Sequence, residues 1–153
     1  MSKAKSDFTM LTPVPEQHLI SGIDMSSQQG FVTFGSDAAM PWSELALHVD
    51  VDHPSDILIY ASESVIKGEP CATYIARFVS YQGARGGKAP ADIAKYRPVS
   101  TEADGAWQAF YVVSDLRKLE KPIPVSKLRG KDRKSNFAKN FIPIGPTLID
   151  QPF

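Results

Sequence analysis

The chain has 153 residues, of which 42% are apolar, a content typical of one globular domain and too high for a disordered chain. Its single cysteine, Cys71, excludes an intrachain disulfide and fits a reducing compartment. The formal net charge of zero hides an asymmetry, because residues 117–140 contain nine Lys or Arg and two acids, whereas residues 37–69 contain seven acids and one Lys. The basic segment is either an anion-binding surface or ordinary solvated surface.

The sequence predicts a soluble, cytoplasmic protein with no membrane partner. Residues 1–7 are polar and lack the apolar stretch of a signal peptide. The longest apolar runs, such as residues 57–61 and 109–113, have the length of strands. A membrane helix needs roughly 20 apolar residues. The sequence indicates no oligomeric state.

The first 29 residues are rich in Ser, Gln and Pro and lack clear periodicity. We expect a flexible tail over residues 1–29, with one short turn near Pro15 to Ile20, and a folded domain over residues 30–153. In that domain Phe31 to Phe34 is predicted to be the first strand, ended by polar residues.

A helix and a hairpin are expected next. Residues 42–51 fit a short helix with Ser43 as N-cap. Residues 56–62 (DILIYAS) are dense in strand-forming residues and predict a strand buried on both faces. Residues 71–81 (CATYIARFVSY) predict a long return strand, so the two form a hairpin joined by a long loop.

The rest of the chain alternates polar segments with strands. Residues 82–105 form a polar insertion with a helical turn near residues 90–96, where Pro90 suits a first helical position. Residues 106–114 (AWQAFYVVS) predict another strand. The remaining segments are a connection with a short helix (122–129), a basic loop (131–140) and a last strand (141–149), which Pro143 and Pro146 place at an edge or bulge.

These elements predict an α+β fold. About five strands with short helices between them indicate a small, partly closed β-barrel of mixed or antiparallel strands. Antiparallel pairing is favoured because only the segments around the short helices are long enough for a crossover.

Aromatic residues beside loops suggest a binding function. Trp42 follows Pro41 in a predicted non-strand segment, where packing explains an indole less easily than it does in mid-strand. A base stacked on such a ring gains about 1–3 kcal/mol. The alternative is that Trp42 covers one end of the barrel. In the binding interpretation, the basic loop at residues 127–139 contacts phosphate.

Other chemistry finds little support in the sequence. Cys71 is a lone thiol at a strand start, which is more often a buried apolar residue than a nucleophile. His48 and His53 lie near several aspartates, but spacing alone does not show the three or four ligands of a metal site. Neither a phosphate-binding glycine loop nor a nucleophile elbow is present. We expect no metal and no cofactor.

The order of the segments resembles the PUA-like superfamily, and within it the EVE and YTH domains that bind modified bases. The resemblance covers about residues 30 to 150, and the order of the pieces carries it more than any one of them. The pieces are FVTFGSD (31–37), PWSE (41–44), PSDILIYAS (54–62), EPCATYIARFVS (69–80), WQAFYVVSDLRKLEKPIPVSKLR (107–129) and FIPIGPTLI (141–149).

The resemblance implies a base-binding site. Ser36 and Asp37 would hydrogen-bond to a base edge, and Trp42 would form one wall of an aromatic cage. The other implied base-binding residues, at the pocket mouth and on a second wall, are Tyr60, Ser62 and Tyr96. The implied phosphate-binding residues are Lys131, Arg133, Lys134 and Lys139.

Three functions follow from these observations. The first is a nucleic-acid-binding module, without catalytic residues, that holds a modified base of DNA or RNA in an aromatic pocket. The second is an enzyme, a hydrolase acting on a modified nucleoside, as the resemblance to ASCH-type barrels allows. Its candidate residues are Lys67, Glu69 and Thr73, because a lysine beside a carboxylate can activate a hydroxyl. The third is an interaction protein, for example a toxin–antitoxin accessory protein.

Overall fold

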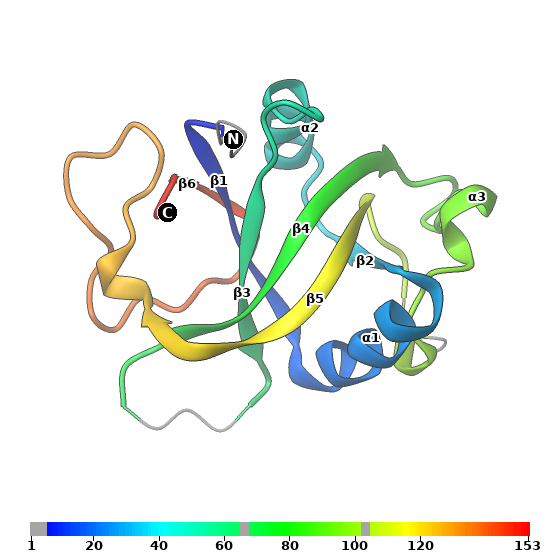
Figure 1. Ribbon diagram of the computed structural model, residues 1–153, viewed down its shortest axis with the longest axis horizontal. Coiled ribbons are helices and arrows are strands. Elements are labelled where there is room, and N and C mark those ends of the chain that lie inside the picture. Colours follow the sequence, from blue (N-terminus) through cyan, green and yellow to red (C-terminus); the bar gives the residue numbers. More distant parts are fainter. Residues whose placement is uncertain (1–5, 65–67, 102–104) are drawn as a thin grey trace.

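A computed structural model of the chain describes residues 6–64, 68–101 and 105–153 (Figure 1). The strands are β1 (Phe8–Pro15), β2 (Phe31–Ser36), β3 (Asp56–Ser62), β4 (Cys71–Gly83), β5 (Ala109–Pro124) and β6 (Thr147–Asp150). The helices are α1 (Glu16–Gln29), α2 (Met40–His48) and α3 (Ala91–Ala94), with 3-10 turns η1 (Val99–Thr101) and η2 (Val125–Lys127). Within these ranges no helix has both the length and the apolar content that crossing a bilayer requires.

The strands form one six-stranded sheet in the order β2-β5-β4-β3-β1-β6. Neighbours are antiparallel except for β1 and β3, which run parallel. In the described part of the chain, β2 and β6 each have a partner strand on one side, so the sheet is open. The predicted α+β class with a mixed sheet is confirmed. The sheet has six strands instead of about five, and its closure into a barrel is not confirmed.

The prediction of a flexible tail is wrong for residues 8–29, because they form β1 and α1. β1 lies between β3 and β6, and its Met10 and Leu11 are fully buried in clusters on opposite faces of the sheet. α1 follows immediately and buries Leu19 in the larger cluster. Residues 1–5 lie outside the described residues.

Two prolines obscured β1 in the sequence. Pro13 and Pro15 lie in the half of β1 that pairs with β3 alone, because pairing with β6 ends at Leu11. A proline lacks the N–H that a strand donates, so it is tolerated where one side of the strand has no partner. The strand therefore forms although its sequence pattern is that of a turn.

Several predicted elements are confirmed, with changed bounds. β3 and β4 form the expected hairpin, and β3 is buried from Ile57 to Ala61. α2 begins at Met40, so Ser43 lies inside the helix and is not its N-cap, which is Ala39. β5 continues beyond its predicted end at Ser114, and three register shifts in the β4–β5 pairing bend this part of the sheet. β6 is a short edge strand that starts after both prolines.

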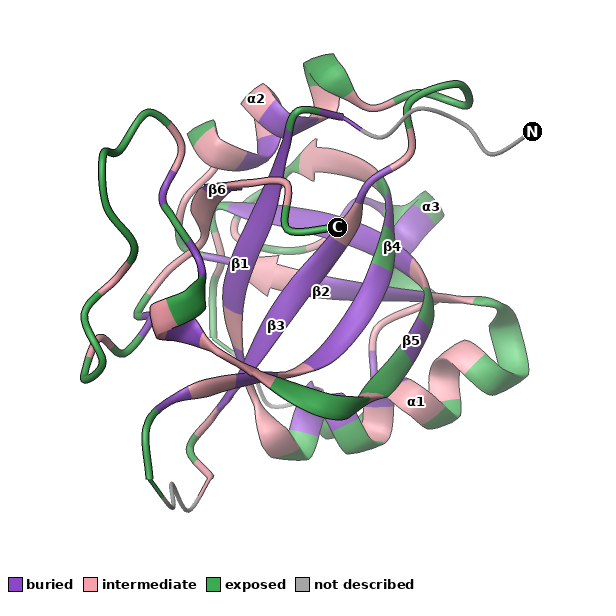
Figure 2. Ribbon diagram, turned by 60° about the vertical axis from the view of Figure 1, so that its left-hand side comes forward, coloured by how far each residue is buried: buried purple, intermediate pink, exposed green. Residues whose placement is uncertain are grey.

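The larger core cluster lies on the face of the sheet that α1 and α2 cover, and it centres on Trp42. The indole of Trp42 is 0% exposed and stacks on Tyr111, with ring centroids 3.8 Å apart and planes at 12°. Phe78 stacks on the indole as well, at 5.9 Å. Figure 2 shows buried residues along β1, β3 and the middle of β4. Most of β2 and the first five residues of β5 are buried as well. Trp42 therefore fixes α2 to the centre of the sheet.

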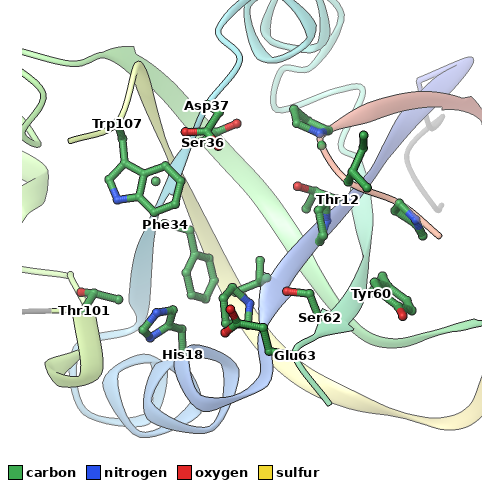
Figure 3. Close-up of a pocket in the computed structure, with 18 of the residues that line it drawn as sticks. Thr12, His18, Phe34, Ser36, Asp37, Tyr60, Ser62, Glu63, Thr101 and Trp107 are labelled. Carbon is green, nitrogen blue, oxygen red and sulfur yellow. The ribbon is translucent and has the colours of Figure 1, made fainter. Parts of the chain in front are cut away.

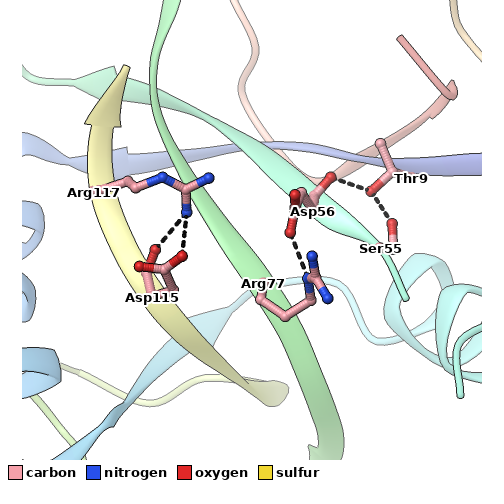
Figure 4. A network of polar contacts seen from close by, with 6 residues as sticks. All are labelled: Thr9, Ser55, Asp56, Arg77, Asp115 and Arg117. Atoms are coloured by element: carbon pink, nitrogen blue, oxygen red, sulfur yellow. Dashed lines mark hydrogen bonds and ion pairs between the residues drawn. The ribbon is translucent and has the colours of Figure 1, made fainter. Parts of the chain in front are cut away.

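A polar network joins β1, β3 and β4 at the end of the sheet where β3 starts (Figure 4). The Thr9 hydroxyl donates to the carbonyl of Asp56 at 2.8 Å and accepts a hydrogen bond from Ser55. The Asp56 carboxylate accepts from Arg77 Nε at 2.6 Å. These contacts link the parallel pair β1–β3 to the hairpin, so the start of β3 is held by side chains as well as by the backbone ladder.

The burial of Trp42 gives a stability prediction. We expect Trp42→Ala to lower the free energy of unfolding by about 3–5 kcal/mol, since it removes a large side chain from a packed core. The measurement is chemical denaturation followed by circular dichroism. Met40→Ala, an exposed position on the same helix, is the control and should change stability by less than about 0.5 kcal/mol. Equal effects of the two substitutions would contradict a core position for Trp42.

Candidate functional site

A pocket of about 530 Å³ lies at the C-terminal ends of β1, β2 and β3 (Figure 3). Its walls come from these three strand ends, from the start of α1, from the segment around η1 and from residues 142–146 before β6. Of the six residues predicted to bind a base, four line it together: Ser36, Asp37, Tyr60 and Ser62. They come from two strands, β2 and β3, that are not neighbours in the sheet. The curvature of the sheet therefore brings together residues about 25 positions apart in the sequence.

Trp107 supplies the aromatic wall of the pocket. Its indole lies directly against Gly35 of β2, and a Cβ atom added to that glycine would be 2.5 Å from the ring. A glycine within a strand often marks such a close approach. Trp107 is half-buried, so part of its ring is accessible. Figure 3 shows the indole beside Ser36 and Asp37, with Tyr60 on the other side of the pocket.

The polar groups of the pocket differ in what they already bind. The hydroxyl of Ser36 accepts from Trp42 Nε1–H at 3.0 Å and donates to the carbonyl of Ala38 at 3.2 Å, so it is occupied. Asp37 is exposed at the rim, and Ser62 is half-buried. Neither side chain forms a hydrogen bond or ion pair with a described residue, so both can bind a ligand. Ser36 therefore lines the pocket, but its hydroxyl holds the Trp42 indole and is not available to a ligand.

A histidine and an arginine lie at the side of the pocket near η1. His18 of α1 is buried, and its Nδ1 is hydrogen-bonded to Ser100 Oγ at 2.8 Å. Arg97 donates to the carbonyl of Thr33 at 3.1 Å, and its guanidinium lies over the ring of Phe110. These contacts tie the segment around η1 to α1 and β2, so this wall is held by side-chain bonds.

Two predicted aromatic walls are not part of the pocket. Trp42 is wrong as a cage wall, because it is buried in the core and reaches the pocket only through its bond to Ser36. Tyr96 is also wrong as the second wall, because it does not line the pocket and its ring packs on Phe31 at 5.3 Å. Sequence reasoning missed Trp107 as the wall. The available signal was Gly35 at the end of a predicted strand, directly after Phe34, together with a tryptophan at the start of another predicted strand.

The predicted phosphate-binding residues lie outside the pocket. Lys131 is half-buried and forms ion pairs with Glu44 at 3.3 Å and Asp132 at 3.0 Å, which raise its pKa and occupy its charge. The other three predicted cations, Arg133, Lys134 and Lys139, are exposed and form no ion pair with a described residue. The loop that carries them runs directly into residues 142–146 of the pocket wall.

Two of the three residues considered for a hydrolase, Glu69 and Thr73, lie at one cavity. Glu69 and Thr73 line a second cavity, of about 450 Å³, which also contains Cys71. The Thr73 hydroxyl is buried and accepts or donates no hydrogen bond among the described residues, so Glu69 does not activate it here. Lys67 lies outside the described residues. Burial, and next the charge of Glu69, raise the pKa of the Cys71 thiol, which disfavours the nucleophilic thiolate.

The histidines considered for a metal site are not grouped with other ligands. The ring of His48 packs edge-on against Phe8, with centroids 4.9 Å apart. His53 is exposed and pairs with Asp50 at 3.1 Å. Among the described residues no three His, Cys, Asp or Glu side chains are placed to hold a metal ion.

Comparisons with known proteins add little to this geometry. Neither a family model nor a curated protein matches the chain. A crystal structure of a protein from Pseudomonas putida is similar at 14% sequence identity and a TM-score of 0.45, over 74% of this chain and 71% of that chain. At that TM-score the similarity carries no argument about fold or function.

The contact between Gly35 and Trp107 gives a direct test of the pocket wall. We expect Gly35→Ala to displace the indole, because the added methyl group cannot be accommodated beneath the ring. The measurement is the indole N–H signal of Trp107 by NMR, which can be assigned because the chain has two tryptophans. Gly83→Ala is the control, since a Cβ at Gly83 meets no atom within 4 Å. An unchanged Trp107 signal in the Gly35 variant would show that the ring does not lie on β2.

Proposed function

We propose that the protein is a nucleic-acid-binding module that holds a modified base in the pocket beside Trp107. The observation that carries the proposal is a half-buried indole, supported from behind by Gly35, with one hydrogen-bonding group beside it (Asp37) and another across the pocket (Ser62). A planar ring stacked on the indole would place its edge near Asp37 and Ser62. These are the two requirements for holding an extruded base, a stacking surface and partners for its edge.

The dimensions and chemistry of the pocket support a ligand of this kind. Its volume falls within the range of about 300–1,000 Å³ that small-molecule sites occupy. Its lining combines apolar residues, including Val14, Phe34 and Pro143, with polar and charged groups. Ile144, on the wall before β6, is 95% exposed, which is unusual for a branched apolar side chain at a pocket. A bound ligand would cover part of this apolar surface.

The charged residues near the pocket favour binding of a nucleotide that is part of a longer nucleic acid. Lys139 lies three residues before Ile142, which lines the pocket. The sugar and phosphates of a base held beside Trp107 would leave the pocket across residues 142–146 and meet the exposed cations of the basic loop. Phosphate contacts of this kind fix position and add affinity without reading sequence.

The first experiment tests the base pocket. A panel of plain and modified nucleosides is screened by thermal shift, since a ligand that binds the native state alone raises its melting temperature. We expect Trp107→Ala to weaken binding of the best nucleoside by about 1–3 kcal/mol, the value of base–aromatic stacking. Tyr96→Ala is the control and should bind normally, because Tyr96 lies outside the pocket. No shift with any nucleoside, or equal affinity for the Trp107 variant, would reject the proposal.

The second experiment tests the basic loop. Binding of single-stranded oligonucleotides carrying the best base is measured by fluorescence anisotropy between about 50 and 200 mM salt, a range over which several phosphate contacts would show. We expect Lys134→Gln with Lys139→Gln to reduce the salt slope by about 1.4, at about 0.7 per contact with a single strand. Lys88→Gln, an exposed lysine that does not line the pocket, should leave the slope unchanged. A slope that is flat in the parent protein would exclude phosphate contacts.

A further inference from the structure

The second cavity adjoins the Trp107 pocket. Tyr60 and Ser64 line both, so the two spaces meet at the C-terminal end of β3. The second cavity continues from there over the starts of α1 and β4 to Lys118 of β5. A ligand longer than a nucleobase could therefore occupy both spaces by passing over Tyr60.

Two hydroxyl groups that line the second cavity have no hydrogen-bond partner among the described residues. Tyr60 is 5% exposed as a whole residue, and its hydroxyl bonds to no described residue but stays accessible at the cavity. The Thr73 hydroxyl is buried and also lacks a partner in the described part of the chain. Most buried polar groups in folded proteins are hydrogen-bonded, so the buried, unpaired Thr73 hydroxyl lining this cavity indicates that something else binds it.

Tyr60 and Thr73 lie directly beyond the last paired residues of the hairpin, and both line the second cavity. The β3–β4 ladder ends with Ile59 opposite Tyr74, and the same register continued by one residue would place Tyr60 opposite Thr73. Cross-strand neighbours of this kind have Cβ atoms about 4.5–5.5 Å apart. Burial raises the pKa of Tyr60, so its hydroxyl stays protonated and can donate at neutral pH. The pair therefore offers two hydrogen-bond donors to the same cavity.

The charged groups of the cavity have both signs. Lys118 is exposed and forms no ion pair with a described residue. Glu69 accepts a hydrogen bond from Ser126 at 3.2 Å, and Glu16 begins α1. A purely anionic ligand would meet two carboxylates here, and a purely cationic one would meet an unpaired lysine. A group with both charges matches the cavity.

We propose that the pocket and the second cavity form one bipartite site for a base that carries an amino-acid-like, zwitterionic substituent. This inference rests on the proposed function, since the ring is held beside Trp107. The substituent passes over Tyr60, its carboxylate binds Lys118 and the hydroxyls of Tyr60 and Thr73, and its ammonium group faces Glu69 and Glu16. The modification that the protein recognises is thus a charged side chain on the base and not a methyl group.

The test compares matched ligands by isothermal titration calorimetry. The probes are uridine and adenosine, each plain, with a 3-carboxypropyl group and with a 3-amino-3-carboxypropyl group on N3 of uridine or N6 of adenosine. We expect the zwitterionic form of at least one base to bind at least about tenfold more tightly than the other two forms, the gain of a charge-assisted hydrogen bond. Equal binding of the zwitterionic and carboxypropyl forms would overturn the assignment of the substituent.

Two substitutions test which residues give the zwitterionic form its higher affinity. Thr73→Val removes an unpaired hydroxyl at nearly constant volume, so the protein should fold at least as stably while losing most of the gain. Lys118→Gln should lose the gain as well. Lys121→Gln is the matched control, because it lies on the same strand and does not line the second cavity. A gain that persists in both the Thr73 and Lys118 variants would overturn the bipartite site.

The outcomes separate this inference from the proposed function. If plain nucleosides bind through Trp107 and the substituent adds nothing, the base pocket stands and the bipartite site is rejected. If only the zwitterionic forms bind, and Thr73→Val and Lys118→Gln remove that binding, the bipartite site is supported. If neither plain nor substituted nucleosides bind, both proposals are rejected. Free 2-aminobutyrate serves as a further control, since binding without a ring would contradict the need for the Trp107 pocket.

Discussion

The stacking of Trp42 between α2 and the sheet is the interaction on which the rest of the structure depends. The indole packs against Tyr111 of β5 and Phe78 of β4, so it connects the helix to the two longest strands. Its Nε1–H also donates to Ser36 at the end of β2. One buried side chain thus fixes both the helix and the strand end from which the pocket begins. A buried indole N–H without a partner would destabilise the folded state. The hydrogen bond to Ser36 therefore helps to hold Trp42 in the core.

The two ends of the sheet serve different purposes. Where β3 starts, Thr9, Asp56 and Arg77 fill the space between strands with hydrogen bonds. Where β3 ends, some polar groups of the pocket and the second cavity lack such partners among the described residues, as the buried hydroxyl of Thr73 shows. Register shifts between β4 and β5 bend the sheet, and the open curvature leaves space at that end. The space at that end, together with the unpaired Thr73 hydroxyl beside it, is the physical basis for proposing a ligand there.

The resemblance to EVE and YTH domains remains a prediction, and the pocket fits it only in part. Ser36, Asp37, Tyr60 and Ser62 do line one pocket, whereas the aromatic wall is Trp107 in place of Trp42 and Tyr96. The position of each tryptophan in its element explains why Trp107, and not Trp42, forms the wall. Trp42 follows the polar end of β2, but α2 turns its side chain into the core. Trp107 precedes β5, and Gly35 of the paired β2 leaves room for its ring.

The sequence by itself determined the elements whose signals are local. The apolar run of β3, the return strand β4 and the helical turn after Pro90 follow from residue pattern and need no knowledge of distant contacts. It also placed Ser36, Asp37, Tyr60 and Ser62 near strand ends. Only the tertiary structure decided that residues 8–15 form an inner strand, because a strand with two prolines is stable only where β6 ends beside it. It likewise decided which tryptophan is core and which is accessible, since burial depends on contacts such as Gly35 beneath Trp107 that no local pattern specifies.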